Sequence, residues 1–319
     1  MTQALTEPPK RSPQTFLNFP LVEDLDNLQA DVAILGIPFG LPYRMGGGAN
    51  PQSEAPDVIR AMSERVAMGL DHFDFDVGGP LLDGRDVRVV DCGNVRADPY
   101  DPQLHYQLAE QAARKILAAG AMPIVIGGDH GIPIPVFKAY DGYDAGEITL
   151  VHIDAHLDWR DEINGVTEGY SSPIRRASEM AQFGEIYQLG IRGAGSARSD
   201  EVEAANAYGA HIFTAYDIHE AGMPAVLEKI PDGGNYFITL DVDGLDPAAM
   251  PGVLAPVAGG LTFHQVRQMI HGLVAKGRVV GMDVNEFAPK YDTGYISAVT
   301  CGQFITNLIG ASVRAGYFD

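Results

Sequence analysis

The sequence is poor in cysteine and in basic residues. Only Cys92 and Cys301 occur among 319 residues, far apart and in no metal-binding spacing. They indicate neither a disulfide framework nor a thiolate metal site, and we expect buried, reduced thiols in a cytoplasmic protein. Asp and Glu number 42 against 22 Lys and Arg, which gives a formal net charge of −20. This balance argues against nucleic acid or an anionic membrane as a partner and suits a cationic ligand.

Long apolar runs are also missing. No run reaches the roughly 18 apolar residues of a membrane-spanning helix, so none is predicted. The first residues, MTQALTEPPKRSPQTF, lack the apolar core of a secretory signal. Because no linker, repeat or low-complexity tract interrupts the chain, we predict a mobile N-terminal arm over 1–20 and a single domain over 21–319.

The sequence does contain short runs rich in Val and Ile that alternate with helical patterns. This alternation predicts an α/β fold, with a mostly parallel sheet of about eight strands and helices on both faces. The predicted strands span 31–39, 87–93, 122–129, 147–154, 185–192, 211–218, 235–243 and 279–287. The predicted helices include 53–66, 104–120, 196–209 and 262–277, the last between an N-capping Thr262 and Gly277. A Gly-rich stretch over 44–56 is typical of loops that carry binding sites.

Acidic residues and histidines gather at the ends of three predicted strands. They are Asp129 and His130 in GGDH, Asp154, His156 and Asp158 in DAHLD, and Asp241, Asp243 and Asp246 in DVDGLDP. Every second side chain of a strand points the same way, and ligands of open α/β sheets bind at the carboxyl ends of the strands. Carboxylates crowded together and partly buried are costly without a cation. We therefore predict that these strand ends converge on a metal site.

The predicted site suits two metal ions. If the three strand ends are neighbours, two imidazoles and four carboxylates converge, from His130, His156, Asp154, Asp158, Asp241 and Asp243. Six such side chains are too many for one open catalytic metal, but they suit two ions ~3.5–4 Å apart. Oxygen and imidazole donors without thiolate favour Mn²⁺, with Ni²⁺ as the main alternative and Fe²⁺, Co²⁺ or Zn²⁺ also compatible. Taken alone, GGDH fits a turn with an N-capping Asp, and DVDGLDP resembles a calcium loop that lacks its late Glu. The three motifs together favour the metal site.

In this order and spacing, the three motifs resemble the signature of the ureohydrolase family, which includes arginases, agmatinases and related guanidino-compound hydrolases. The resemblance runs from DVAILGIPF to GMDVNEFAPKYD. It implies a three-layer α/β fold, a dinuclear Mn²⁺-type site, homo-trimers or homo-hexamers, and hydrolysis of a guanidinium to urea and an amine. The metal roles that it implies are His130 and Asp158 for one ion, His156 and Asp243 for the other, and Asp154 and Asp241 as bridges.

The chemistry of these residues agrees with the resemblance. Four carboxylates offset two divalent ions, and water shared between two cations supplies hydroxide near neutral pH. Attack on a guanidinium carbon then requires a proton for the leaving amine, which Asp158 is placed to relay. Glu286, in DVNEF, falls where the family has a Glu that binds the guanidinium. The predicted substrate is a small cationic guanidino compound: agmatine-like, a guanidino acid, or a guanidine or biguanide derivative.

The segment after DAHLD departs from the family pattern. Arginases and most agmatinases carry a histidine there, whereas this chain has none from 157 to 210 and has Glu168 instead. We predict that Glu168 or Tyr170 contacts the substrate and that Trp159 forms a wall of a small pocket. The alternatives are that Glu168 and Tyr170 lie on the surface of a loop and that Trp159 packs against other side chains. His152 alternates with apolar neighbours and is expected to be structural.

Two functions stay open. The first is an active guanidino hydrolase. The second is a non-catalytic or accessory subunit of a hetero-oligomeric ureohydrolase, built with a paralogue. The complete set of six ligands together with Glu286 favours the first. A single-metal deacetylase of related fold would not need all of these acidic ligands.

Overall fold

The computed structural model describes residues 5–7, 14–44, 50–65, 69–143 and 146–319. Residues 1–4 and 8–13 of the expected arm, and 45–49 of the Gly-rich loop, lie outside the described residues. The described part of the first 20 residues packs against the domain and does not form an arm. Phe16 is fully buried, and its N–H donates to the Asp91 carboxylate at 2.8 Å. The reason is the apolar content of Phe16, Leu17 and Phe19, which join the core.

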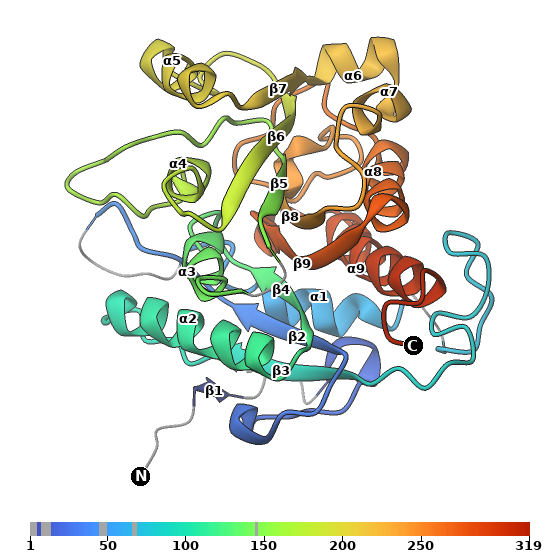
Figure 1. The fold of residues 1–319 in the computed structure, drawn as a ribbon. Coiled ribbons are helices and arrows are strands. Elements are labelled where there is room, and N and C mark those ends of the chain that lie inside the picture. Colours follow the sequence, from blue (N-terminus) through green and yellow to red (C-terminus); the bar gives the residue numbers. More distant parts are fainter. Residues whose placement is uncertain (1–4, 8–13, 45–49, 66–68, 144–145) are drawn as a thin grey trace.

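Within these residues the strands form one sheet in the order β1-β3-β2-β4-β9-β8-β5-β6-β7 (Figure 1). Their bounds are β1 Thr6–Glu7, β2 Val32–Ile37, β3 Val89–Val95, β4 Met122–Gly127, β5 Ile148–Ile153, β6 Phe183–Ile191, β7 His211–Thr214, β8 Asn235–Asp241 and β9 Arg278–Asn285. All neighbours are parallel except β1, which runs antiparallel to β3. The predicted mostly parallel sheet is confirmed, and the strand added to the eight predicted ones is β1.

Helices cover both faces of the sheet, which gives the three layers. They are α1 Ala55–Ser63, α2 Pro102–Ala118, α3 Pro133–Ala139, α4 Pro173–Ala177, α5 Ser199–Tyr208, α6 Ala215–Ala221, α7 Met223–Leu227, α8 Phe263–Lys276 and α9 Ile296–Arg314. Short 3-10 turns occur at Phe16–Asn18, Leu25–Asn27, Val242–Gly244 and Pro289–Tyr291. One layer joins α1, α9, α8, α7 and α6, and the other joins α2, α3 and α4. Two large apolar clusters, one on each side of the sheet, form most of the core, and a small third cluster joins Leu41, Tyr106 and Ile134.

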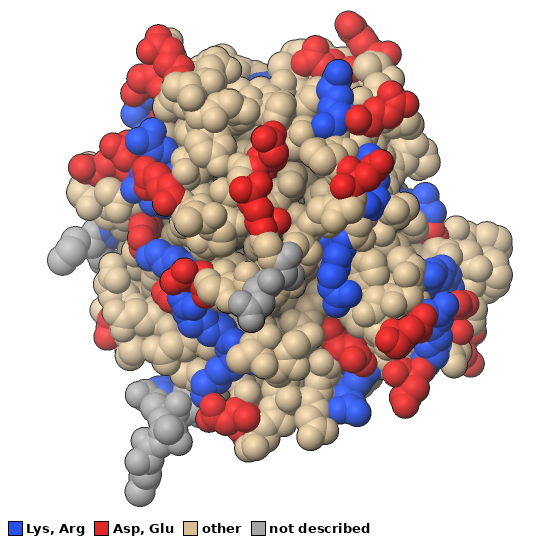
Figure 2. All heavy atoms as spheres, viewed as in Figure 1, with Lys and Arg blue, Asp and Glu red and all other residues tan. Residues whose placement is uncertain are grey.

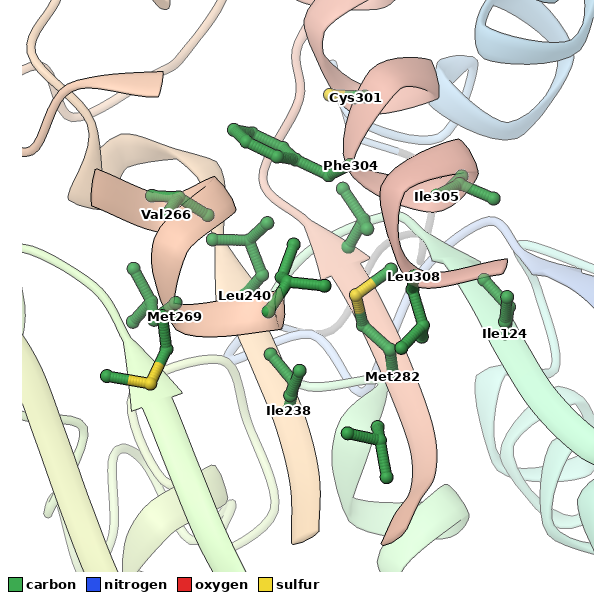
Figure 3. Close-up of a cluster of buried hydrophobic side chains, with 14 of the residues drawn as sticks. Ile124, Ile238, Leu240, Val266, Met269, Met282, Cys301, Phe304, Ile305 and Leu308 are labelled. Atoms are coloured by element: carbon green, nitrogen blue, oxygen red, sulfur yellow. The ribbon is translucent and has the colours of Figure 1, made fainter. Parts of the chain in front are cut away.

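The first of these clusters lies under α8 and α9 (Figure 3). Phe304 and Leu308 of α9 and Val266 of α8 pack on Leu240 and Met282 of the central strands, and all five are fully buried. Helix α9 has a mean hydropathy of 1.3 over a length that would span a membrane, but 83% of that window is buried inside the protein. Its contacts with α1 and α8 identify it as a core helix.

Local sequence signals set several element ends. Thr262 caps α8 as predicted, since its hydroxyl accepts the Gln265 N–H at 3.2 Å. A second capping box explains why the predicted strand 211–218 is too long: Thr214 accepts the Asp217 N–H at 3.1 Å, which ends β7 and starts α6. Both cysteines are buried and unpaired, as predicted. On the face seen in Figure 2, acidic and basic side chains are interspersed, so the negative charge there is spread over a solvated surface.

Candidate metal centre

The candidate site residues lie at the carboxyl ends of four adjacent central strands, in the spatial order β4, β9, β8 and β5. Parallel strands bring these ends to one edge of the sheet. His130 follows β4, Glu286 follows β9, Asp241 ends β8, and the DAHLD residues follow β5. Segments more than a hundred residues apart in sequence therefore meet at this edge (Figure 1).

The first group of ligand atoms surrounds His130. Its Nδ1 lies 2.9 Å from Asp158 Oδ2, 3.2 Å from Asp154 Oδ2 and 3.4 Å from Asp241 Oδ2. Although these oxygens are close, Nδ1 is buried without a properly directed hydrogen bond. The other ring nitrogen, Nε2, lies 3.0 Å from Thr239 Oγ1, which orients the ring. An unsatisfied imidazole nitrogen facing three carboxylates fits a site for a divalent cation.

The second group is centred on His156, whose Nδ1 lies 3.2 Å from both Asp154 Oδ1 and Asp243 Oδ2. The donor atoms fall into two compact groups: His130, His152, Asp154 and Asp158 form one, and Asp154, His156 and Asp243 form the other. Asp154 belongs to both, which is the position of a ligand shared by two ions. Asp241 belongs to neither, so its bridging role stays a prediction. His152 was not among the predicted ligands, yet it lies at the centre.

The pKa values of the carboxylates show what the cluster costs without cations. Burial raises the pKa of Asp241 well above its ordinary value, and the charges of Asp243 and Asp154 raise it further. Burial also raises the pKa of Asp243 to about 6. Asp154 differs: despite its burial, contacts with His130 and His152 hold its pKa well below the usual range. Divalent ions would supply the missing positive charge and favour the ionised form of every carboxylate ligand.

Two residues of the candidate site have strained backbones. Asp158 has φ 56° and Glu286 has φ 67°, which is the left-handed region that non-glycine residues seldom adopt. Such conformations cost roughly 1–3 kcal/mol each and persist where the surroundings hold them. The Glu286 carboxylate is held by the His130 N–H at 2.7 Å and by Gln52 Nε2 at 2.6 Å. Burial, followed by the charge of Asp129, raises the pKa of Glu286 to about 8.

A cavity of about 500 Å³ opens over the cluster. The candidate residues on its wall are His156, Asp158, Asp241, Asp243, Glu286 and Tyr170. Tyr170 is half-exposed and lies edge-on to Tyr43, with 4.6 Å between the ring centroids. Sequence reasoning missed an ion pair on the same wall, between Arg160 and Glu201. Arg160 follows the DAHLD motif closely, but its partner Glu201 lies 41 residues further along the chain, so local spacing does not reveal the pair.

Trp159 and Glu168 do not lie on this cavity, which corrects two predicted substrate contacts. Trp159 is 2% exposed, and its indole N–H donates to Gln188 Oε1 at 2.7 Å in the core. Glu168 accepts a hydrogen bond from Lys138 Nζ of α3 at 2.6 Å. Each side chain is held by a partner distant in sequence, which local spacing does not reveal.

Comparisons with known proteins identify the family of this chain. The arginase family model matches residues 30–310. The agmatinase of Bacillus subtilis (strain 168) is 31% identical over 292 residues, 90% of this chain and 93% of that protein. The guanidinobutyrase of Pseudomonas aeruginosa is 28% identical over 287 residues, 88% of this chain and 86% of that protein. A crystal structure described as a hypothetical agmatinase from Burkholderia thailandensis has a TM-score of 0.80 at 27% identity, covering 99% of this chain and 98% of that one. The chain therefore belongs to the arginase family and is a ureohydrolase of that dinuclear metal-dependent family.

Proposed function

We propose that the protein hydrolyses a small guanidino compound to urea and an amine with two divalent ions, Mn²⁺ being favoured and Ni²⁺ the alternative. The observation that carries this proposal is the pair of ligand groups that share Asp154 beneath one cavity. The relatives named agmatinase and guanidinobutyrase support the substrate class. The complete set of ligands argues for an active enzyme rather than an accessory subunit.

His130 and Asp158 would hold one ion, His156 and Asp243 the other, and Asp154 and Asp241 would lie between them. When bound, the ions supply a strong electrostatic field that makes water acidic and polarises the substrate. Glu286, fixed by His130 N–H and Gln52, offers its carboxylate to the guanidinium. Asp158 stands on the cavity wall and can pass a proton to the departing nitrogen.

The cavity also bears on the choice of substrate. Beyond the metal ligands, Asp129 and Glu286, the charged side chains on its described wall are Arg160 and Glu201, which pair with each other. Glu201 has a second task, because it accepts the Arg198 N–H at 2.9 Å at the start of α5. A distal ammonium, as in agmatine, would therefore meet no uncommitted carboxylate here. We propose a substrate without that ammonium: a guanidino acid whose carboxylate pairs with Arg160, or a small neutral-tailed guanidine.

A urea-release screen tests both levels of this proposal. The substrates are agmatine, arginine, guanidinobutyrate, guanidine, dimethylguanidine and a biguanide, each with Mn²⁺ and with Ni²⁺. We expect guanidinobutyrate or a small guanidine to be hydrolysed faster than agmatine. Agmatine as the best substrate would overturn the substrate preference alone. Protein that holds two ions but releases no urea from any compound would favour the accessory-subunit alternative.

We further propose a homo-trimer or homo-hexamer located in the cytoplasm. Light scattering of the purified chain gives the assembly mass, and co-expression with a paralogue tests for a hetero-oligomer. A stable monomer that releases urea at full rate would contradict the oligomer.

A further inference from the structure

A chain of hydrogen bonds runs through the core to Asp154, and the proposed reaction does not use it. Trp159 Nε1 donates to Gln188 Oε1 at 2.7 Å. Gln188 Nε2 lies 2.9 Å from His152 Nδ1, and His152 Nε2 lies 2.8 Å from Asp154 Oδ2. Trp159 is 2% exposed and the other three residues are fully buried. These hydrogen bonds therefore connect the sole tryptophan of the protein to the carboxylate that both ligand groups share.

The direction of every bond in this chain is determined. An indole N–H can only donate, so Gln188 must turn its oxygen towards Trp159. Gln188 Nε2 also donates to the Leu157 carbonyl at 2.8 Å, and a carbonyl can only accept. Because both ends of the amide are fixed, His152 Nδ1 must accept from Gln188. His152 therefore carries its hydrogen on Nε2 and donates it to Asp154.

This arrangement leaves Asp154 oriented but still able to bind cations. One oxygen accepts from His152, and the other accepts the His156 backbone N–H at 2.6 Å. A carboxylate oxygen has two lone pairs, so each oxygen keeps one for a cation. His152 also stacks on the His130 ring, with 5.2 Å between centroids and 30° between planes. Both of its nitrogens are engaged, which argues against His152 as a ligand itself.

We propose that Trp159, Gln188 and His152 are positioning residues that hold Asp154 in the orientation needed to bind two ions. The inference rests on the proposed metal centre and adds to it three residues that touch neither metal nor substrate. Partners that orient metal ligands typically change metal affinity by about 10- to 100-fold when they are removed. The same connection makes Trp159 emission a report on the occupancy of the centre.

The decisive variant is Gln188→Met. It keeps the volume of the side chain and retains His152, but it removes the hydrogen bond to His152 Nδ1. Gln182→Met is the matched control. Gln182 donates to the Phe137 carbonyl at 2.8 Å and takes no part in the hydrogen bonds that lead to Asp154. Metal-free parent and variants are titrated with Zn²⁺, a closed-shell ion, while Trp159 emission and bound metal are measured. Metal-free thermal unfolding checks that each variant is folded.

We expect the parent and Gln182→Met to bind two ions with a change in Trp159 emission. Gln188→Met should bind about 10- to 100-fold more weakly, and its emission should no longer follow occupancy. If Gln188→Met binds Zn²⁺ with the affinity and emission change of the parent, the positioning role is wrong but the proposed metal centre is unaffected. If the parent binds no metal, both the positioning role and the proposed metal centre are wrong. Should Gln188→Met not fold, Trp159→Phe removes the outer donor, and unchanged metal affinity by calorimetry would contradict the proposal.

His152→Phe separates positioning from direct ligation. A positioning role predicts that the variant still reaches two ions per chain at saturating Zn²⁺, with affinity lowered about 10- to 100-fold. A stoichiometry of one ion at saturation would show that His152 is a ligand and would overturn the proposal.

Discussion

Two clusters of buried charge lie on the same sheet, and they are neutralised differently. Near β3, the fully buried Arg60 donates to both oxygens of Asp91 at 2.8 and 2.9 Å, and to Asn94 Oδ1 at 2.6 Å. At the ends of β4, β8 and β5, the ion pairs described for Asp154 and its neighbours involve only histidines. The first cluster contains a permanent counter-charge, the guanidinium of Arg60, whereas the histidines of the second cluster are charged only when protonated.

This difference separates a structural cluster from a binding site. A buried ion pair with its hydrogen bonds satisfied is complete, and removing one partner leaves a costly lone charge. Burial, together with the charges of neighbouring carboxylates, raises the pKa values of Asp241 and Asp243, and such a cluster is complete only with a cation. The missing counter-charge therefore identifies the metal centre more directly than the presence of acidic residues does.

The largest expected effect is that of Asp154→Ala. Because Asp154 belongs to both ligand groups, its loss should release both ions and reduce urea release to background. Metal analysis and the urea assay measure this, and thermal unfolding of the metal-free variant checks that it is folded. Two tightly retained ions with near-parent turnover would refute the shared-ligand assignment.

Arg60→Met should have the opposite pattern. It removes the cation of the self-neutralised cluster and leaves Asp91 buried and uncompensated, at a cost of about 3–5 kcal/mol in the free energy of unfolding. Chemical denaturation measures the loss, and the metal content of the folded fraction should stay at two ions. A stability equal to that of the parent would mean that the two clusters do not differ as argued.

Metal removal should affect only the second cluster. At a free ion concentration about a thousandfold above Kd, binding adds about 4 kcal/mol to stability. Chelation should therefore lower the Tm of the parent, and Mn²⁺ or Ni²⁺ should restore it. The same treatment should leave the Tm of Asp154→Ala unchanged, and a parallel fall in that variant would point to metal bound elsewhere.

Glu286→Gln tests a carboxylate that faces the substrate rather than the ions. A charge-assisted hydrogen bond is worth ~1.5–3 kcal/mol, which corresponds to a loss of about 10- to 100-fold in kcat/KM. The metal content should not change. Loss of an ion in this variant would mean that Glu286 supports the centre instead.

The smallest expected effect concerns Arg160, a partly exposed member of an ion pair. Arg160→Gln should lower kcat/KM for guanidinobutyrate relative to guanidine by roughly fivefold, the upper range for such a pair. Glu168→Gln is the matched control, because Glu168 is paired with Lys138 away from the cavity wall. A change of ranking in the control alone would restore the predicted role of Glu168.

Much of the metal centre follows from local sequence. The motifs GGDH, DAHLD and DVDGLDP each follow an apolar strand, and parallel strands end at one edge, so all three motifs could be placed at the same edge of the sheet from sequence alone. The spacing within DAHLD, by contrast, was predicted from the alternation of a strand, whereas β5 ends at Ile153 and Asp158 has φ 56°, so the loop backbone sets the directions of these side chains.

Other features were decided by the tertiary structure. Insertion of β9 between β4 and β8 is what brings Glu286 to His130, and no local pattern specifies that order. Trp159 and Glu168 form hydrogen bonds with Gln188 and Lys138, which lie 29 and 30 residues away in sequence. The physical reason is that backbone periodicity acts between neighbours in sequence, whereas hydrogen bonds and ion pairs act between neighbours in space. The sequence therefore determined which residues could bind metal, and the fold decided which of the remaining polar side chains face the cavity and which hold the ligands in place.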